Sequence, residues 1–325
     1  MKLSEKLFSI PLVKFVWYRL NHTFSSRESK ILCNYNEPRR MIWGNDAPQK
    51  KRVPKLIWSY WSGKKSMCAE ACRNSWNIHE SGFTIAILSR ETVRDYLPDF
   101  PVLSDDTPEQ KVSNLIRLML LERYGGIWID YSTLLTKPLN WVLDLIETNN
   151  CEALAFYNEF SDEYKTNHDR PIIENGFLAS ATESKFISEW RRVYQECILS
   201  KNYKEFFRSR DDFDELTSNF LRKEKDYIDY FVCYIAAQFV MMKSKSYRLI
   251  LINAEDEYYY LSYNLRPPRN KREFCKEVLL RSKESSTCSK LVKITGHHRK
   301  AIDEHIEYGC YRLDSIIGRH LPDSM

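Results

Sequence analysis

The segment from residue 108 to residue 130 constrains the fold more than any other part of the chain. A helical pattern covers 108–124: Pro108 suits a first helical turn, and Gly125 and Gly126 stop the helix. The apolar residues 127–129 follow at once, and so short a continuous apolar run is typical of a strand buried on both faces of its sheet. A long helix that leads straight into a buried strand predicts an α/β fold.

The rest of the chain repeats this alternation. Strands are predicted at 55–61, 83–88, 152–157 and 177–180, and helices at 67–76, 183–199, 212–223 and 226–242. Alternating strands and helices favour an α/β domain built around a mostly parallel sheet. We expect this domain to span residues 53–325 and to hold a helical insertion or lobe at about 183–243.

Composition excludes several classes of protein. With 43% hydrophobic and 29% charged residues, the 325-residue chain has the balance of a soluble globular protein. Its 9 glycines and 12 prolines are too few for a disordered or fibrous chain, and no apolar run approaches the roughly 20 residues of a spanning helix. The 9 cysteines form no CxxC pair, and no cleavable export signal is recognised before them. We therefore expect a cytoplasmic protein with reduced, buried thiols and no zinc site.

Basic residues gather in two stretches of the chain. Residues 1–55 carry twelve Lys and Arg against four Asp and Glu, and residues 264–300 carry eleven against three. Such stretches indicate an anionic partner, either a membrane surface or nucleic acid, or else solvated lysine-rich loops. Neither stretch has an RNP-like aromatic pattern or a zinc-finger spacing, so no nucleic-acid partner is expected.

The first 52 residues are expected to form a helix and a linker. Apolar residues recur at helical spacing over 1–20, and four basic residues interrupt them, which suits a helix lying in a membrane interface. This interpretation predicts peripheral attachment to the inner face of the cytoplasmic membrane. The alternative is a helix that caps the globular body. Residues 21–52 are polar and basic and are predicted to be a linker.

Two polar residues share one face of the predicted helix 108–124. Asn114 and Arg117 are three positions apart, and apolar residues surround them. A guanidinium held beside an apolar face needs an anionic or hydroxyl-rich partner, which could be a ligand. The alternatives are that Arg117 caps the helix or pairs with Glu122 or another carboxylate.

Asp130 closes the predicted strand 127–129. In open α/β sheets, ligands bind outside the carboxyl ends of the strands. A carboxylate at this point, after a Gly-Gly turn that allows close approach, is therefore a candidate ligand for a metal ion or a ribose hydroxyl. The alternative is an Asx-turn residue that only shapes the chain reversal.

These residues resemble a known family. Residues 113–117 read Ser-Asn-Leu-Ile-Arg, and Leu121, Gly125, Gly126, Trp128 and Asp130 follow. The pattern is similar to that of the capsular polysaccharide synthesis proteins and the related family 32 glycosyltransferases. In that group, Ser-Asp-x-x-Arg runs into Leu-x-x-x-Gly-Gly-x-Trp/Tyr-x-Asp, the start of the DXD motif. Weaker similarities lie at 53–63, 174–179, 227–231 and 292–295, so the resemblance covers about 53–300 in matching order.

The resemblance implies the glycosyltransferase A fold and a retaining glycosyltransferase that uses a nucleotide-sugar donor, a UDP-sugar being expected. By position, Trp61 would lie against the nucleobase, and an indole face suits base stacking. Arg117 would contact the donor sugar or its diphosphate. The implied catalytic residues are Asp130, Arg117 and Asn175, and the implied substrate-binding residues are Trp61, Asn114, Gly125, Gly126, Trp128, Ser132 and Lys293.

One departure from the family pattern concerns the metal. The motif here reads Asp130-Tyr131-Ser132, so the second carboxylate is missing. Asp130 and Ser132 remain the expected ligands of a divalent metal ion, Mn²⁺ or Mg²⁺, which prefers oxygen ligands. Another residue is then needed to help, and the candidates are Glu174, His297 and His298, although the two histidines have the alternative of being solvated.

A second departure concerns the donor sugar. Asn114 stands where the family pattern has Asp, at a position expected to read sugar hydroxyls. An amide both donates and accepts hydrogen bonds, whereas a carboxylate only accepts, so the identity of the sugar is left open.

The expected function is transfer of a sugar to a glycan or lipid-linked acceptor during synthesis of a bacterial capsule or O-antigen. The alternative is a non-catalytic subunit that binds carbohydrate or nucleotide and has kept the fold. The missing second carboxylate of the motif leaves that alternative open.

Overall fold

The computed structural model describes residues 35–45, 52–80, 82–159, 169–217, 229–265, 270–282 and 289–322, together with Val16 and Leu20. The predicted amphipathic helix over 1–20 and most of the predicted linker therefore lie outside the described residues. Among the helices that are described, none is both long and apolar enough to cross a bilayer. The described cysteines are all buried, as the sequence predicted, and none of them is in a disulfide.

A seven-stranded mixed sheet forms the centre of the molecule, in the order β1-β8-β6-β7-β4-β2-β3. Its strands are β1 (Arg40–Trp43), β2 (Leu56–Tyr60), β3 (Thr84–Leu88), β4 (Gly126–Ile129), β6 (Ala153–Asn158), β7 (Ile172–Ser180) and β8 (Leu249–Asn253). Strands β3, β2, β4, β6 and β8 run in one direction, whereas β7 and the edge strand β1 run antiparallel to their neighbours. The expected α/β fold with a mostly parallel sheet is confirmed.

The sheet extends beyond the predicted domain boundary. Residues 40–43, within the stretch expected to be a linker, form β1 and pair with β8. Trp43 explains this strand, because its ring is buried in the core and its Nε1 donates to the carbonyl of Asp169 at 2.8 Å. Strand β7 is also longer than the predicted 177–180, because polar residues at its start conceal it in the sequence pattern.

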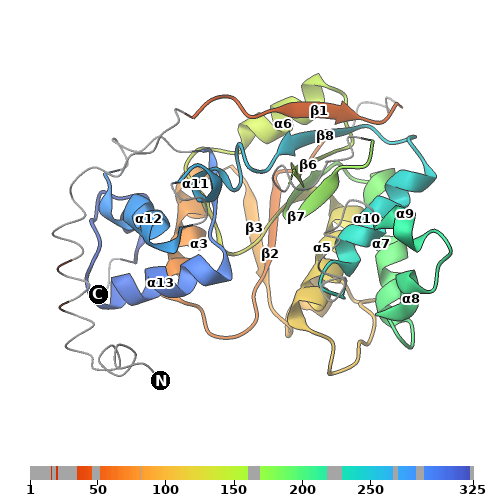
Figure 1. Cartoon of the computed structure of the whole chain (residues 1–325), viewed down its shortest axis with the longest axis horizontal. Helices are drawn as coiled ribbons and strands as arrows, with labels where there is room; N and C mark the ends of the chain where they lie inside the picture. Colours follow the sequence, from red (N-terminus) through yellow and green to blue (C-terminus); the bar gives the residue numbers. More distant parts are fainter. Residues whose placement is uncertain are drawn as a thin grey trace.

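Helices cover both faces of the sheet (Figure 1). One face carries α5 (Glu109–Tyr124), α7 (Lys185–Leu199) and α10 (Val232–Lys243), whose apolar residues share a core with Trp58 of β2. The other face carries α3 (Met67–His79) and α6 (Asn140–Thr148), which share a core with Ile57 of the same strand. Successive strand residues point to opposite faces, so β2 serves both cores.

The remaining elements are short or lie at the margins. They are α4 (Val93–Tyr96), α8 (Glu205–Arg208), α9 (Phe213–Leu216), α11 (Tyr260–Tyr263), α12 (Lys271–Cys275), the π-helical turn Lys276–Leu280, α13 (Gly296–Glu307) and the 3₁₀ turn Gly318–His320. A second sheet pairs β5 (Thr133–Leu135) with β9 (Leu291–Lys293). Of the residues expected to form a helical insertion or lobe, α7 packs on α5 and α10, and α10 packs on β7. Of the predicted helix 212–223, only Phe213–Leu216 is helical in the described residues, and 218–228 lie outside them.

The Gly-Gly turn between α5 and β4 is as predicted. Gly125 and Gly126 both have positive φ, at 63° and 98°, which favours glycine. A Cβ on Gly126 would also lie 2.7 Å from the carbonyl oxygen of Leu56 in the adjacent β2. Glycine is therefore needed here for the turn and for close packing of β4 on β2.

Candidate active site

Asp130 follows β4 directly, at the carboxyl end of the strand. Its Oδ1 accepts hydrogen bonds from Arg117 Nη2 at 2.8 Å and from Trp128 Nε1 at 3.0 Å, and its Oδ2 accepts from Lys293 Nζ at 2.5 Å. Burial raises the pKa of Asp130, but the charges of Lys293 and Arg117 outweigh it and hold that pKa below its usual value. Asp130 is thus an ionised carboxylate held between two cations, and not merely a turn residue.

Helix α5 supplies Arg117 and Asn114, which share a face as predicted. Arg117 Nη1 donates to Asn114 Oδ1 at 2.6 Å, and the guanidinium lies 4.7 Å from the ring centre of Trp128. Asn175 of β7 also donates to Asn114 Oδ1, at 3.2 Å. The carboxylate partner of Arg117 is Asp130 and not Glu122, which pairs with Arg191 instead.

Lys293 reaches Asp130 through the small second sheet. Lys293 is opposite Thr133 in the β5–β9 pairing, and the next residue, Ile294, donates its N–H to the carbonyl of Ser132 at 2.9 Å. The chain after β4 and the end of β9 therefore lie side by side. This pairing places the ammonium group of Lys293, from the C-terminal part of the chain, beside the carboxylate of Asp130.

A polar cavity of about 330 Å³ opens in front of Asp130. The carboxyl end of β2, helix α5, the start of β7 and the end of β9 all border it, as expected for a ligand site at the carboxyl edge of a sheet. The predicted site residues that line it are Trp61, Asn114, Arg117, Asp130, Ser132, Asn175 and Lys293. The candidate active site is therefore this cavity.

Three predicted substrate-binding residues are not brought to the cavity wall. Gly125 and Gly126 lie at the opposite end of β4 from Asp130, where they pack against backbone atoms of neighbouring strands. Trp128 is fully buried beneath Arg117 and donates to Asp130. The two glycines therefore form the turn before β4, and Trp128 packs against Arg117 and holds Asp130 by a hydrogen bond.

Trp61 forms one side wall of the cavity. Its ring centre lies 5.0 Å from that of Tyr131, and the guanidinium of Arg299 lies 5.0 Å from it. Its Nε1 is buried and has no hydrogen-bond partner within the described parts of the chain. A planar ligand that stacked here would meet an indole that already contacts a tyrosine ring and has a guanidinium over its own ring.

The described residues provide only part of a metal site. In the described part of the chain, no three His, Cys, Asp or Glu side chains come together as a set that could hold a metal ion. Both oxygens of Asp130 already accept from cations, and Ser132 beside it is a neutral ligand. A metal ion bound here would need an oxygen of Asp130 freed from Lys293 or Arg117 and would take its remaining ligands from phosphate oxygens and water, which is how proteins commonly hold Mg²⁺.

The three candidate helpers are placed differently from one another. Glu174 lines the cavity, but its carboxylate is held by Asn158, Tyr234 and Tyr259. His298 is buried and stacks on Phe274, with ring centres 4.1 Å apart. Its neighbour His297 is exposed. The two histidines are therefore not a solvated pair.

Sequence reasoning missed the tyrosines of this cavity. Tyr230, Tyr234 and Tyr259 line it, and Tyr234 and Tyr259 bond Glu174. The run of three tyrosines at 258–260 was the available signal, but it did not reveal which ring faces the site.

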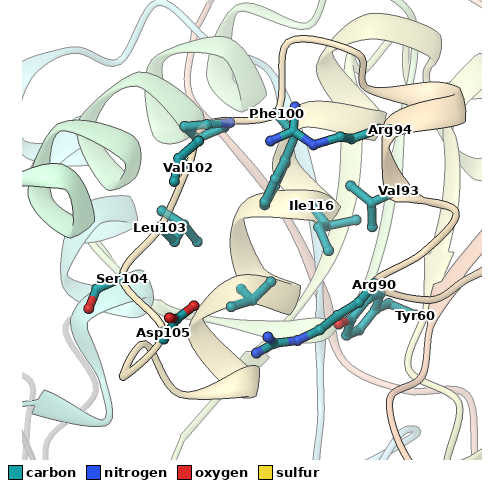
Figure 2. Close-up of a pocket in the computed structure, with 12 residues that line it drawn as sticks. Tyr60, Arg90, Val93, Arg94, Phe100, Val102, Leu103, Ser104, Asp105 and Ile116 are labelled. Atoms are coloured by element: carbon teal, nitrogen blue, oxygen red, sulfur yellow. The ribbon is translucent and has the colours of Figure 1, made fainter.

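A separate, mostly apolar cavity of about 230 Å³ lies on the other side of Tyr60 (Figure 2). Phe100, Val102 and Leu103 form one wall and Ile116 of α5 another. In the wall of this cavity, Arg90 and the hydroxyl of Tyr60 both donate hydrogen bonds to the carboxylate of Glu109. Apart from Tyr60, the two cavities share no lining residue, and none of the predicted site residues borders the apolar one.

The model of the capsular polysaccharide synthesis protein family matches residues 43–295, which is most of the chain. The chain belongs to that family. This membership confirms the resemblance found in the sequence and indicates a glycosyltransferase-like, capsule-related enzyme. The matched range also begins at Trp43, the last residue of β1, and so includes only the end of that edge strand.

Comparison with curated proteins finds no match. Among solved structures, the chain is similar to a glycosyltransferase involved in glycosylation of the major capsid of PBCV-1, at 13% identity and a TM-score of 0.38, over 78% of this chain and 98% of that one. It is also similar to the PaToxG glycosyltransferase, at 9% identity and a TM-score of 0.29, over 73% of this chain and 89% of that one. At these TM-scores neither likeness carries an argument about this site.

Proposed function

We propose that the chain is a retaining glycosyltransferase that takes a sugar from a nucleotide donor, a UDP-sugar, and passes it to a glycan or lipid-linked acceptor. The observation that carries the proposal is the placement of Asp130 between Arg117 and Lys293 on the wall of a polar cavity. Next to Asp130 two cations face one carboxylate, and the other carboxylate of the wall, Glu174, is held by Asn158, Tyr234 and Tyr259. The side of the cavity at Lys293 and Arg117 therefore suits the diphosphate of such a donor.

Each part of the cavity suits one part of the donor. The nucleobase stacks on Trp61, the ribose hydroxyls bond Asp130, and the diphosphate lies against Lys293 and Arg117. Asn114 and Asn175, which are bonded to each other, face the sugar. These side chains are held by mutual hydrogen bonds before the donor arrives, so binding costs little ordering.

Transfer then depends on position and charge. The bond between the anomeric carbon and the diphosphate oxygen breaks, and its electron pair stays on the diphosphate. The acceptor oxygen forms the new bond on the same face of the sugar, and its proton passes to the departing diphosphate. Lys293 and Arg117 stabilise the negative charge that develops on this leaving group, which is the form of catalysis that fixed charges supply best.

We keep a divalent metal ion in the proposal as a ligand of the bound donor. Asp130 would supply one oxygen, with Ser132 beside it, and the diphosphate would supply others. Bound there, Mn²⁺ or Mg²⁺ would add positive charge at the leaving group.

We place the reaction in capsule or O-antigen synthesis, at the inner face of the cytoplasmic membrane. Family membership supports the capsule-related role. The apolar and basic pattern of residues 1–20 supports peripheral attachment, because buried apolar area and cationic charge add in interfacial binding.

The test is incubation of the purified chain with a panel of UDP-sugars, Mn²⁺ and candidate acceptors. Release of UDP together with a glycosylated product of retained anomeric configuration is expected. Binding of UDP without turnover across the acceptor panel would instead identify a non-catalytic binding subunit. A chain that binds no nucleotide would contradict both.

A further inference from the structure

A further cavity, the second cavity, adjoins the candidate active site. It is not the apolar cavity beside Tyr60. It measures about 360 Å³ and lies between the start of α10, helix α11 and the start of α13. The two cavities share the wall residues Glu174, Tyr230, Tyr234, Tyr259 and Thr295. A ligand in the second cavity would therefore meet a ligand in the first across this shared wall.

The two cavities differ in chemistry. Arg117 and Lys293 line the first cavity, whereas the described residues that line the second include no Lys or Arg. The second cavity instead presents five aromatic rings, those of Tyr230, Phe231, Tyr234, Tyr259 and Tyr263. His297 and His298 also line it, and Glu174 belongs to the wall that both cavities share. Without a Lys or Arg in its described lining, the second cavity is less suited to a diphosphate than the first and suits a neutral ligand with apolar faces and hydroxyl groups.

The shared wall is rigid because Glu174 fixes it. Oε1 accepts from the N–H of Gly176 at 3.0 Å and from the Tyr234 hydroxyl at 3.3 Å. Oε2 accepts from Asn158 Nδ2 at 3.2 Å and from the Tyr259 hydroxyl at 3.3 Å. The rings of Tyr234 and Tyr259 are thus anchored before any ligand binds, and a pre-organised surface binds with less loss of entropy.

One buried hydroxyl in the second cavity lacks a partner. Ser262 on α11 is 4% exposed, and its Oγ has no hydrogen-bond partner in the part of the chain that the structure describes. Buried hydroxyls are nearly always paired, so an unpaired one on a cavity wall points to a polar ligand or water. Tyr230 at the rim is 53% exposed and packs edge-on against Phe231, which leaves ring surface for a sugar face.

We propose that this second cavity binds the terminal sugar ring of the acceptor, as a neutral pyranose stacked on the tyrosines and bonded to Ser262. The proposal rests on the proposed function, since it assigns the acceptor half of that reaction. The charge contrast between the cavities then separates the two substrates: the anionic donor goes to Lys293 and Arg117, and the neutral acceptor sugar goes to the aromatic side.

The test measures each half of the site separately. The probes are methyl α- and β-pyranosides of glucose, galactose, mannose and N-acetylglucosamine, whose binding is followed by saturation-transfer NMR with UDP present. UDP binding is measured by calorimetry on the same samples. Ser262→Ala removes only the unpaired hydroxyl, and Tyr263→Ala removes a ring that borders the second cavity but not the first. The matched control is Ser59→Ala, because Ser59 is also buried with an unpartnered Oγ in the described structure and borders neither cavity.

We expect at least one methyl pyranoside to bind the wild-type chain. Its affinity should fall about fivefold in Ser262→Ala, the loss of one hydrogen bond, and should be unchanged in Ser59→Ala. The affinity for UDP should stay the same in all variants. Should Ser262→Ala fail to fold, Tyr263→Ala gives the same comparison.

Two results would contradict acceptor binding in the second cavity while leaving the proposed donor site intact. One is UDP binding with no pyranoside binding to the wild-type chain. The other is a pyranoside that binds equally well to Ser262→Ala and Tyr263→Ala. A chain that binds a pyranoside through Ser262 but no UDP or UDP-sugar would leave the pocket standing and contradict the proposed glycosyltransferase function instead.

Discussion

Lys293 Nζ lies 2.5 Å from Asp130 Oδ2, although the two residues are 163 positions apart in the chain. Arg117, from helix α5, holds the other oxygen of the same carboxylate. The side chain of Arg117 is only 4% exposed and that of Lys293 11%, so water screens this cluster weakly. An anionic ligand that enters the cavity therefore meets two poorly hydrated cations with one carboxylate between them.

The first prediction concerns this carboxylate. Asp130→Asn keeps the shape of the side chain but removes its charge, so the proposed metal contact is weakened and both cations lose their counter-ion. We expect sugar transfer to fall about a hundredfold or more. The melting temperature should also fall, because two nearly buried cations lose their counter-ion, although Arg117 keeps its bond to Asn114. UDP release and circular dichroism measure the two effects. The exposed Asp144→Asn serves as control, and wild-type turnover in Asp130→Asn would refute the assignment.

The second prediction is that metal binding follows nucleotide binding. Both oxygens of Asp130 are occupied by cations, so Mn²⁺ alone should shift the melting temperature little. A bound diphosphate would draw Lys293 and Arg117 towards itself and bring phosphate oxygens to the metal. Mn²⁺ should therefore raise the melting temperature clearly only when UDP is present, by mass action on the native state. A full shift with Mn²⁺ alone, abolished by EDTA, would show that a complete metal site exists without the donor.

The third prediction concerns Gly176, which lies between the carboxylates of Asp130 and Glu174. A Cβ on Gly176 would lie 2.9 Å from Asp130 Oδ2, 3.2 Å from Glu174 Oε1 and 2.7 Å from the hydroxyl oxygen of Tyr258. The Tyr258 hydroxyl is the nearer contact, but Tyr258 is buried and stacks on Phe156, so both it and Asp130 are pushed from their positions. Gly176→Ala should cost about 1–3 kcal/mol of stability through overpacking. Transfer should fall about a hundredfold, because small displacements of catalytic groups are expensive.

The control for this substitution is Gly82→Ala, because the nearest atom to its added Cβ is the flexible end of Lys55 at 3.9 Å. Thermal melts report stability, and UDP release reports transfer. If Gly176→Ala kept full activity, the position of Asp130 would not matter to the reaction.

Local periodicity could predict only the part of the site built from neighbouring residues, whereas Trp61, Asn175 and Lys293 were expected from the family resemblance and also line the cavity. Asn114 and Arg117 share a helical face and Asp130 ends the next strand, so their proximity follows from local periodicity. The pairing of Lys293 with Asp130 does not, because it depends on the β5–β9 sheet, whose strands are far apart in the chain. No local pattern encodes such a contact.

The start of β7 and the whole of β1 were missed by the sequence pattern because polar or exposed residues interrupt it. In β7, Glu174 and Asn175 break the apolar pattern, yet both are buried because the site supplies their hydrogen bonds. In β1, only Trp43 is fully buried, so the edge strand resembles a polar linker. Tyr258, Tyr259 and Tyr260 look alike in sequence, but only Tyr259 faces the cavities.

The fourth prediction concerns pH and Glu80, which does not line the candidate active site. Burial raises the pKa of Glu80 to about 7, more than the N–H of Leu139 and the charge of Lys55 lower it. Between about pH 4.5 and 7 the folded state keeps this proton while the unfolded state has lost it, so stability falls as pH rises, by at most ~1.4 kcal/mol per pH unit. Glu80→Gln removes that titration and can still accept from Leu139. The variant should therefore melt higher than wild type at pH 8.

At pH 4.5 the melting temperatures of wild type and Glu80→Gln should nearly coincide, because Glu80 is then neutral when folded. Glu307→Gln, at an exposed position, controls for the loss of one charge. Equal stability differences at pH 4.5 and pH 8 would contradict a raised pKa at Glu80.

The last prediction is that Asn114 helps to choose the donor sugar. Its Oδ1 accepts from both Arg117 and Asn175, so Asn114→Asp can keep these two bonds while losing the amide donor. A site built for one pattern of sugar hydroxyls rejects another because buried polar groups are left unpaired, at about 1–3 kcal/mol each. The ratio of kcat/KM between a gluco- and a galacto-configured UDP-sugar should therefore change by roughly tenfold or more. Asn140→Asp, on an exposed helix start, adds the same charge away from the site. If Asn114 only supports Arg117, its substitution should slow both donors alike, and an unchanged ratio would sink the specificity role while leaving the catalytic role of Arg117 in place.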